Sequence, residues 1–151
     1  MRAYVCAGAG FLLAVLWFDL MHDVQVLRPK AGVDGSEAVR SIARYYRRVT
    51  TDARPMNRLV ALVMVLTLAA VVAELVGDDV RPWVAWTSLV LVGAAIGVAA
   101  VRTVGNAVRL GADVDRLTPE HEAVARSIGR DHVLCLVLVG ALLVLQLAWA
   151  G

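Results

Sequence analysis

The stretch AYVCAGAGFLLAVLWF, residues Ala3–Phe18, is followed directly by DLMHD, residues Asp19–Asp23. Its sixteen residues carry no charge, and as a helix they would span about 24 Å of the roughly 30 Å hydrocarbon core of a bilayer. We therefore expect a membrane-spanning helix with Asp19 within or at the edge of the bilayer. A carboxylate at that depth is costly unless it is paired, protonated or facing a wet cavity, so it marks a candidate functional site.

The rest of the chain also has the composition of a membrane protein. Its 151 residues are 60% hydrophobic with a mean hydropathy of +0.70, which is too apolar for an ordinary soluble domain. Three further apolar segments lie at Leu59–Ala73, Trp83–Val101 and Val133–Ala150, and flanking residues extend each to about the twenty needed to cross a bilayer. The sequence predicts one all-α domain over residues 1–151, an integral membrane four-helix bundle.

The distribution of positive charge predicts the orientation. Of the fifteen Lys and Arg residues, eight lie between the first and second apolar segments and five between the third and fourth. Because positive charge gathers on the cytoplasmic side, both long connections are expected in the cytoplasm and both termini outside. Fourteen of the fifteen are Arg, with abundant Ala, Val and Gly. This composition indicates a GC-rich bacterial genome, so we expect a multi-pass protein of the bacterial plasma (inner) membrane.

Helix boundaries follow from prolines, glycines and capping residues. The first helix is expected to end near Leu27, before Pro29, and the second to begin near Thr51 or Asp52. The third is expected to run on to Leu110 and to stop at Gly111, while the fourth runs unbroken from 119 to 149. The small residues of Gly93–Gly97 suit close contact between helices, either inside the bundle or between copies in a homo-oligomer.

The first cytoplasmic connection contains a predicted basic amphipathic helix that opens after Asp34. Its apolar residues recur at helical spacing, and its arginines largely occupy the other faces. Such a helix most often lies on the headgroup surface, so anionic lipid headgroups are expected partners of these arginines. A protein docking role is the alternative, and since no nucleic-acid motif accompanies the helix, no nucleic-acid partner is expected. The apolar residues are Ala38, Ile42, Tyr45, Tyr46 and Val49, and the arginines are Arg40, Arg44, Arg47 and Arg48.

All four membrane helices bring polar residues to the same inner depth. A carboxyl group in a low-dielectric site is suited to proton transfer near neutral pH, so this layer is a candidate acid–base site for a lipophilic substrate. The candidate catalytic residues are Asp19, His22, Asp23, Asn57, Asn106 and His132, and the candidate substrate-binding residues are Trp17, Arg54 and Arg102.

A non-enzymatic scaffold or partner-binding subunit is the main alternative. In that interpretation the arginines anchor the helices, Asp19 pairs with Arg102 or bonds to an Asn, and the polar layer fixes helix register. No cofactor is assigned, although two aspartates and two histidines could hold iron, manganese or zinc, and His22 with His132 could ligate haem. Transport is a further alternative, with Asp19 at the inner end and Glu74 at the outer end as the deepest ionisable candidates. Gln146 could hydrogen-bond to Glu74.

The layout also resembles a known family. Four helices, a long first cytoplasmic connection, Met56-Asn57 opening the second helix and Asn106 closing the third are similar to the anthrone oxygenase-like family of small membrane proteins. The resemblance implies cofactor-independent oxygenation of a polycyclic phenolic substrate. The chain departs from the family pattern at Val104-Gly105-Asn106, where a Pro-x-Asn is expected, and at Pro29, which is displaced from the end of the first helix.

Overall fold

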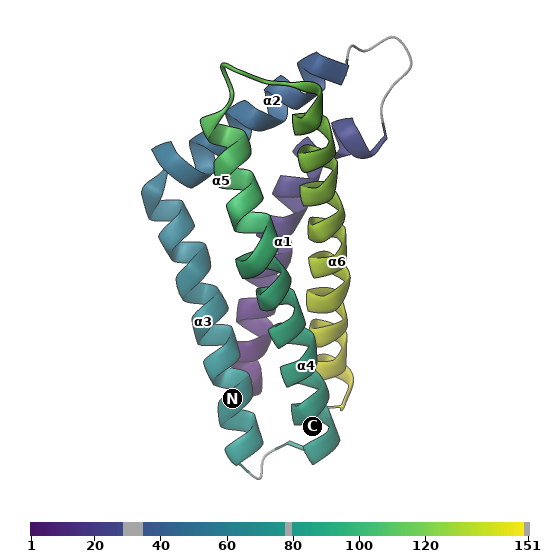
Figure 1. The fold of residues 1–151 in the computed structure, drawn as a ribbon. Helices are drawn as coiled ribbons and strands as arrows, with labels where there is room; N and C mark the ends of the chain where they lie inside the picture. Colours follow the sequence, from purple (N-terminus) through teal and green to yellow (C-terminus); the bar gives the residue numbers. More distant parts are fainter. Residues whose placement is uncertain (29–34, 78–79, 150–151) are drawn as a thin grey trace.

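The computed structural model describes residues 1–28, 35–77 and 80–149, apart from the side chain of Arg54. Within these residues every regular element is a helix (Figure 1). The elements are α1 (Arg2–Leu27), α2 (Gly35–Arg47), the π-helix η1 (Arg48–Asp52), α3 (Arg54–Val76), α4 (Pro82–Val98), the π-helix η2 (Ala99–Thr103), α5 (Val104–Ala112) and α6 (Pro119–Trp149). The expected features at Pro29, Asp34 and the outer turn at 78–79 lie outside the described residues.

Four helical segments are long and apolar enough to cross a membrane. They are Arg2–Leu27, Pro55–Val76, Pro82–Ala112 and Pro119–Trp149, and the third joins α4, η2 and α5 into one rod. The all-α four-helix membrane bundle predicted from the sequence is confirmed. The ends of α1 and α6 agree with their predicted positions, and α3 begins at Arg54, two to three residues later than predicted.

The four spans form a ring of neighbours. Helix α1 packs between α3 and α6, and α4 packs against the same two helices from the other side. The chain runs up and down in alternation, so the start of α1 and the end of α6 lie together at the end opposite α2 (Figure 1). Apolar side chains fill the centre, among them Val5, Val71, Val92 and Leu142, which are almost fully buried.

Helix α2 lies across the end of the bundle where α5 ends and α6 begins (Figure 1). We call this the arginine-rich end. The predicted amphipathic helix is present, but its apolar face packs on the protein and not on lipid: Ile42 meets Leu110 and Ile128 in one core cluster, and all three are fully buried. Each such side chain contributes roughly 1.5–3 kcal/mol relative to exposure to water. Helix α2 is therefore a lid on the bundle.

Gly111 has a different role from the one predicted. Helix α5 continues through it and ends at Ala112, so the glycine does not stop the helix. A Cβ at this position would lie 2.7 Å from the backbone nitrogen and 2.9 Å from the Cα of Arg47. Gly111 thus lets α5 approach the backbone of α2 closely, which holds the lid in place.

Candidate functional site

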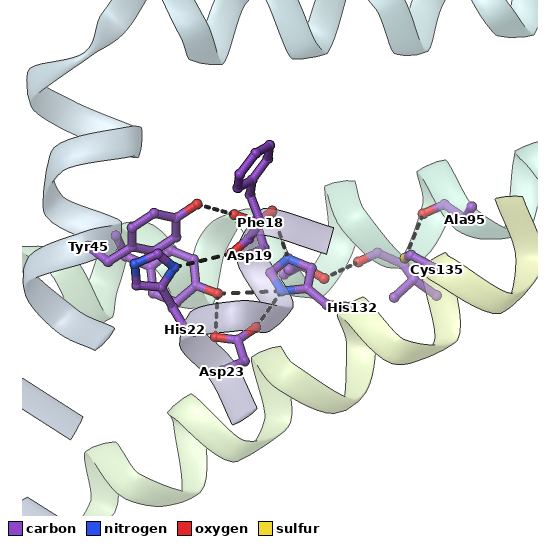
Figure 2. Close-up of polar contacts among 11 residues, drawn as sticks. Phe18, Asp19, His22, Asp23, Tyr45, Ala95, His132 and Cys135 are labelled. Atoms are coloured by element: carbon purple, nitrogen blue, oxygen red, sulfur yellow. Dashed lines mark hydrogen bonds and ion pairs between the residues drawn. The ribbon is translucent and has the colours of Figure 1, made fainter. Parts of the chain in front are cut away.

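A buried cluster of polar side chains joins α1, α2 and α6 near the arginine-rich end (Figure 2). Asp23 is fully buried and uses both carboxylate oxygens. The Tyr46 hydroxyl donates to Oδ1 over 2.8 Å, and His132 Nδ1 lies 2.7 Å from Oδ2. The Nδ1–H donates to Asp23, which fixes the orientation of the imidazole and leaves its Nε2 facing the bundle interior.

Asp19 lies one turn before Asp23 on the same face of α1. The Tyr45 hydroxyl donates to Asp19 Oδ1 over 2.6 Å. The other carboxylate oxygen lies 3.8 Å from His132 Nε2, which is too long for a hydrogen bond but within reach of an ion pair. His22 stacks on the Tyr45 ring, with centroids 3.9 Å apart, and its Nδ1 lies 3.1 Å from the carbonyl oxygen of Phe18.

Local sequence explains how three helices meet here. The aspartates are four residues apart, so both point from α1 toward α6 and α2. The two tyrosines lie in the last turn of α2, just before η1 redirects the chain into α3. On α6, one turn before His132, Gly129 allows a close approach, because a Cβ there would lie 3.2 Å from the Cβ of Asp23.

The two tyrosines of α2 hold their protons strongly. Burial raises the pKa of Tyr45, and the neighbouring Asp19 carboxylate and its hydrogen bond raise it further. Burial also raises the pKa of Tyr46, with Asp23 as the nearest negative charge. Both phenols therefore stay neutral hydrogen-bond donors over the physiological range.

Asp19 lies where two hollows meet. A cavity of about 150 Å³ inside the bundle is lined mainly by apolar side chains, with Asp19, His132 and Cys135 as the ionisable groups of its lining. A groove of about 360 Å³ runs outside it, between α1, the end of α2 and α3. Val15, Asp19 and Val60 line both the cavity and the groove. Because these side chains are shared, Asp19 lies within reach of a molecule that enters from the side of the bundle.

This arrangement can bind or transfer a proton. Asp23 orients His132 from one side, while Asp19 Oδ2 faces Nε2 from the other at the inner end of an apolar cavity. A hydroxyl or amine between these two atoms would meet an acceptor and an imidazole at once. Equally, hydrogen bonds already occupy both oxygens of Asp23, the two tyrosine hydroxyls and His132 Nδ1, as a structural clamp between helices requires.

The other predicted site residues lie around this cluster without joining it. Asn57 lines the outer groove, and Asn106 is half-buried on α5 with no hydrogen bond to any described residue. Trp17 is exposed on the outside of α1 and lines neither the cavity nor the groove. The side chain of Arg54 lies outside the described part of the structure.

Arg102 has a different partner from the one considered in the scaffold interpretation. Its guanidinium lies 3.3 Å from Asp131 on α6 and 3.4 Å from the Ser127 hydroxyl. It does not pair with Asp19. Asp131 is almost fully buried and its Oδ2 has no hydrogen-bond partner among the described residues.

Sequence reasoning missed Tyr45 and Tyr46 as members of the site. The sequence pattern places them only on the apolar face of the predicted amphipathic helix, yet their hydroxyls donate to the two aspartates. A signal was available, because a buried phenol needs an acceptor and the face of α2 had to cover a helix end bearing two carboxylates.

A second buried polar cluster lies at the opposite end of the bundle. The predicted bond between Gln146 and Glu74 is present, with Gln146 Nε2 donating to Glu74 Oε2 over 2.8 Å and lying 2.9 Å from Ser88 Oγ. All three residues are almost fully buried. One oxygen each of Glu74 and Gln146 has no hydrogen-bond partner in the described structure.

Metal binding is one alternative that the aspartates and histidines of the inner polar layer suggest. Within the described ranges, no three His, Cys, Asp or Glu side chains converge in a way that could hold a metal ion. The hydrogen bonds of His132 to Asp23 and of His22 to the Phe18 carbonyl give each imidazole a partner within the protein.

Comparison with known proteins identifies a different family from the one the sequence resembles. No curated protein and no solved structure matches the chain. A family model described as SHR3 chaperone, ER membrane protein SH3, matches residues 1–150. The resemblance to anthrone oxygenase-like proteins is therefore wrong, since a shared helix layout and a few asparagines are not specific enough to define that family. The match supports a multi-pass membrane protein and gives no support to the bacterial plasma membrane expected from the arginine content. The chain belongs to the SHR3 chaperone family of membrane proteins.

Proposed function

We propose that this protein is a non-enzymatic membrane scaffold that binds transmembrane helices of partner proteins. The observation that carries the proposal is an exposed small-residue surface on the α4–α5 rod. Gly93, Gly97 and Gly105 are exposed, and a Cβ built on any of them would meet no atom within 4 Å. Within Gly93–Gly97, the two glycines and Ala94 are exposed, whereas Ala95 is buried in the bundle core.

Such a surface suits helix binding in lipid. Small residues one turn apart allow two helix backbones to approach, and the resulting van der Waals contact drives association where no hydrophobic effect operates between helices. The name of the matched family contains the word chaperone, which agrees with a role in binding other proteins. The internal hydrogen bonds of Asp19, Asp23 and His132 agree with a clamp that keeps the bundle rigid while it binds.

Site-specific photo-crosslinking in membranes tests the proposal. A benzophenone amino acid at Val101, which is 83% exposed beside the glycines, should form adducts with a membrane protein. The same probe at Val65, exposed on α3, is the positional control. Adducts at position 101 should be lost in Gly97→Leu, where a side chain blocks close approach, and kept in Ala61→Leu, a matched small-to-large change on exposed α3.

Two differently tagged copies of the protein separate a partner from a second copy of this chain. Adducts that contain both tags and no other protein would mean a homo-oligomer and would overturn the partner proposal. Adducts that persist unchanged in Gly97→Leu would show that the glycine surface is not the contact. The captured partner should also fall in abundance when this protein is deleted, and recover with the wild-type chain but not with Gly97→Leu.

A second candidate function is proton transfer on a lipophilic substrate. The observation that favours it is the position of Asp19 and His132 together at the inner end of an apolar cavity beside a lateral groove. The two candidates predict opposite results in a deletion strain. If the protein is a scaffold, Asp19→Asn complements and Gly97→Leu fails, because an amide still accepts the bond from Tyr45. If it is an enzyme, Gly97→Leu complements and Asp19→Asn fails.

A further inference from the structure

A basic hollow lies beside the outer groove at the arginine-rich end. Its volume is about 770 Å³, and it is formed by α2, the first residue of η1 and His22 near the end of α1. Arg40, Arg44 and Arg48 line it at intervals of four residues, so they share one side of the helix. All three are exposed, and none makes an ion pair or hydrogen bond with another described residue. Glu37 is the only acidic residue in the lining.

Arg47, which belongs to the same predicted set of arginines, does not line the hollow. Its guanidinium lies 3.4 Å from Asp115, in the segment between α5 and α6, and both side chains are half or more exposed. The three remaining arginines therefore form one patch of positive charge with little compensation. A group with several negatively charged oxygens is the ligand that such a patch favours.

The hollow and the groove have a common wall. His22 and Tyr45 line both, and their rings stack at an interplanar angle of 11°. On the groove side of this wall the lining is mainly apolar, including Phe18, Met56 and Val60. Positive charge thus lies on one side of the stacked rings, and a mainly apolar lining, with Asp19 as its one acidic residue, lies on the other. A ligand that fills both must carry an anionic head on an apolar chain.

We propose that the hollow and groove together form a binding site for one anionic phospholipid. Arg40, Arg44 and Arg48 bind the phosphate, with the Ser41 hydroxyl, which also lines the hollow, as a further donor. One acyl chain lies in the groove between α1 and α3. The proposal is independent of helix binding at α4, because that surface belongs to a different helix from the α1–α3 groove.

Native mass spectrometry of the detergent-purified protein, with added phosphatidylglycerol, tests the site. One lipid should be retained by the wild type, and phosphatidylcholine should be retained much less. Arg44→Gln/Arg48→Gln should bind phosphatidylglycerol about 30-fold more weakly, which corresponds to about 1 kcal/mol for each arginine. The matched control is Arg109→Gln/Arg116→Gln, two exposed arginines of the second basic connection, and it should bind like the wild type.

The groove is tested separately with Val60→Phe, which fills the space for the acyl chain without changing charge. This variant should lose phosphatidylglycerol while its melting temperature stays near that of the wild type. Inorganic phosphate is the second ligand. If phosphate competes with the lipid and Val60→Phe binds phosphatidylglycerol normally, the site is a simple anion site and the proposal is wrong. Equal retention of phosphatidylcholine, or equal loss in both arginine pairs, would also overturn it.

Discussion

At the scale of single residues, Asp23 is the centre of the site. It accepts hydrogen bonds from Tyr46 and His132 and has no exposure to solvent. Asp23→Ala removes both acceptors and leaves a buried phenol and an imidazole without partners. A buried donor without an acceptor costs roughly 1–3 kcal/mol, so we expect a fall of that size or more in the free energy of unfolding. Thermal unfolding in detergent measures it.

The control for this change is Asp115→Ala. Asp115 is 88% exposed and its ion pair with Arg47 is solvated, and exposed pairs of this kind contribute about 0–1 kcal/mol. If the Asp23→Ala and Asp115→Ala proteins have the same melting temperature, the buried hydrogen bonds of Asp23 do not stabilise the bundle.

The second buried polar cluster, formed by Glu74, Ser88 and Gln146 at the opposite end of the bundle, tests the same effect of an unpaired buried polar group. Gln146→Leu leaves the buried Glu74 carboxyl without the amide that now bonds to it, and we expect a marked loss of stability. In Glu74→Leu/Gln146→Leu both polar groups are gone, along with the two oxygens that already lack partners. Replacing both members of a buried pair with apolar groups is often neutral or stabilising. The double variant should therefore unfold at a higher temperature than Gln146→Leu, and a lower one would show that the cluster is a net source of stability.

At the scale of elements, the contact between α5 and α2 depends on Gly111. A Cβ there would lie too close to the backbone of Arg47, and a backbone cannot rotate away as a side chain can. Gly111→Ala should displace α2 and destabilise the protein by about 1–3 kcal/mol. Gly105→Ala, on the same helix with open space around it, should be neutral or stabilise by roughly 0.5–1 kcal/mol. Cleavage of α2 by an added protease, compared between the two variants, reports whether the lid has loosened.

The elements also show how far the sequence can be read. Runs of apolar residues bounded by prolines predict the spans closely, because length and hydropathy alone determine what can cross a bilayer. The predicted depth of Asp19 in the bilayer points to the polar layer around it, and within this layer Asp23 and His132 are in hydrogen-bond contact. The tyrosines were missed because their partners depend on how α2 folds back over α1, which no local pattern contains. Helices of similar hydropathy can pack in several orders, so the neighbours of Asn106 and Arg102 could not be predicted either.

At the scale of the whole molecule, the positive-inside rule predicts which end faces the cytoplasm. The structure places α2 at the end opposite the start of α1 and the end of α6 (Figure 1). The orientation of the bundle in the membrane therefore determines whether α2 and the basic hollow face the cytoplasm.

In a Cys6→Ala/Cys135→Ala background, Ser36→Cys on α2 and Gly77→Cys after α3 provide one exposed thiol at each end. In intact cells a membrane-impermeant maleimide should label Gly77→Cys if the bundle lies in a plasma membrane, and Ser36→Cys only after permeabilisation. In an internal membrane, sealed vesicles whose cytoplasmic face is outward should show the reverse order, with Ser36→Cys labelled at once and Gly77→Cys only after permeabilisation. Labelling of Ser36→Cys from the non-cytoplasmic side in either system would reverse the orientation, and would move the proposed phospholipid site to the other leaflet.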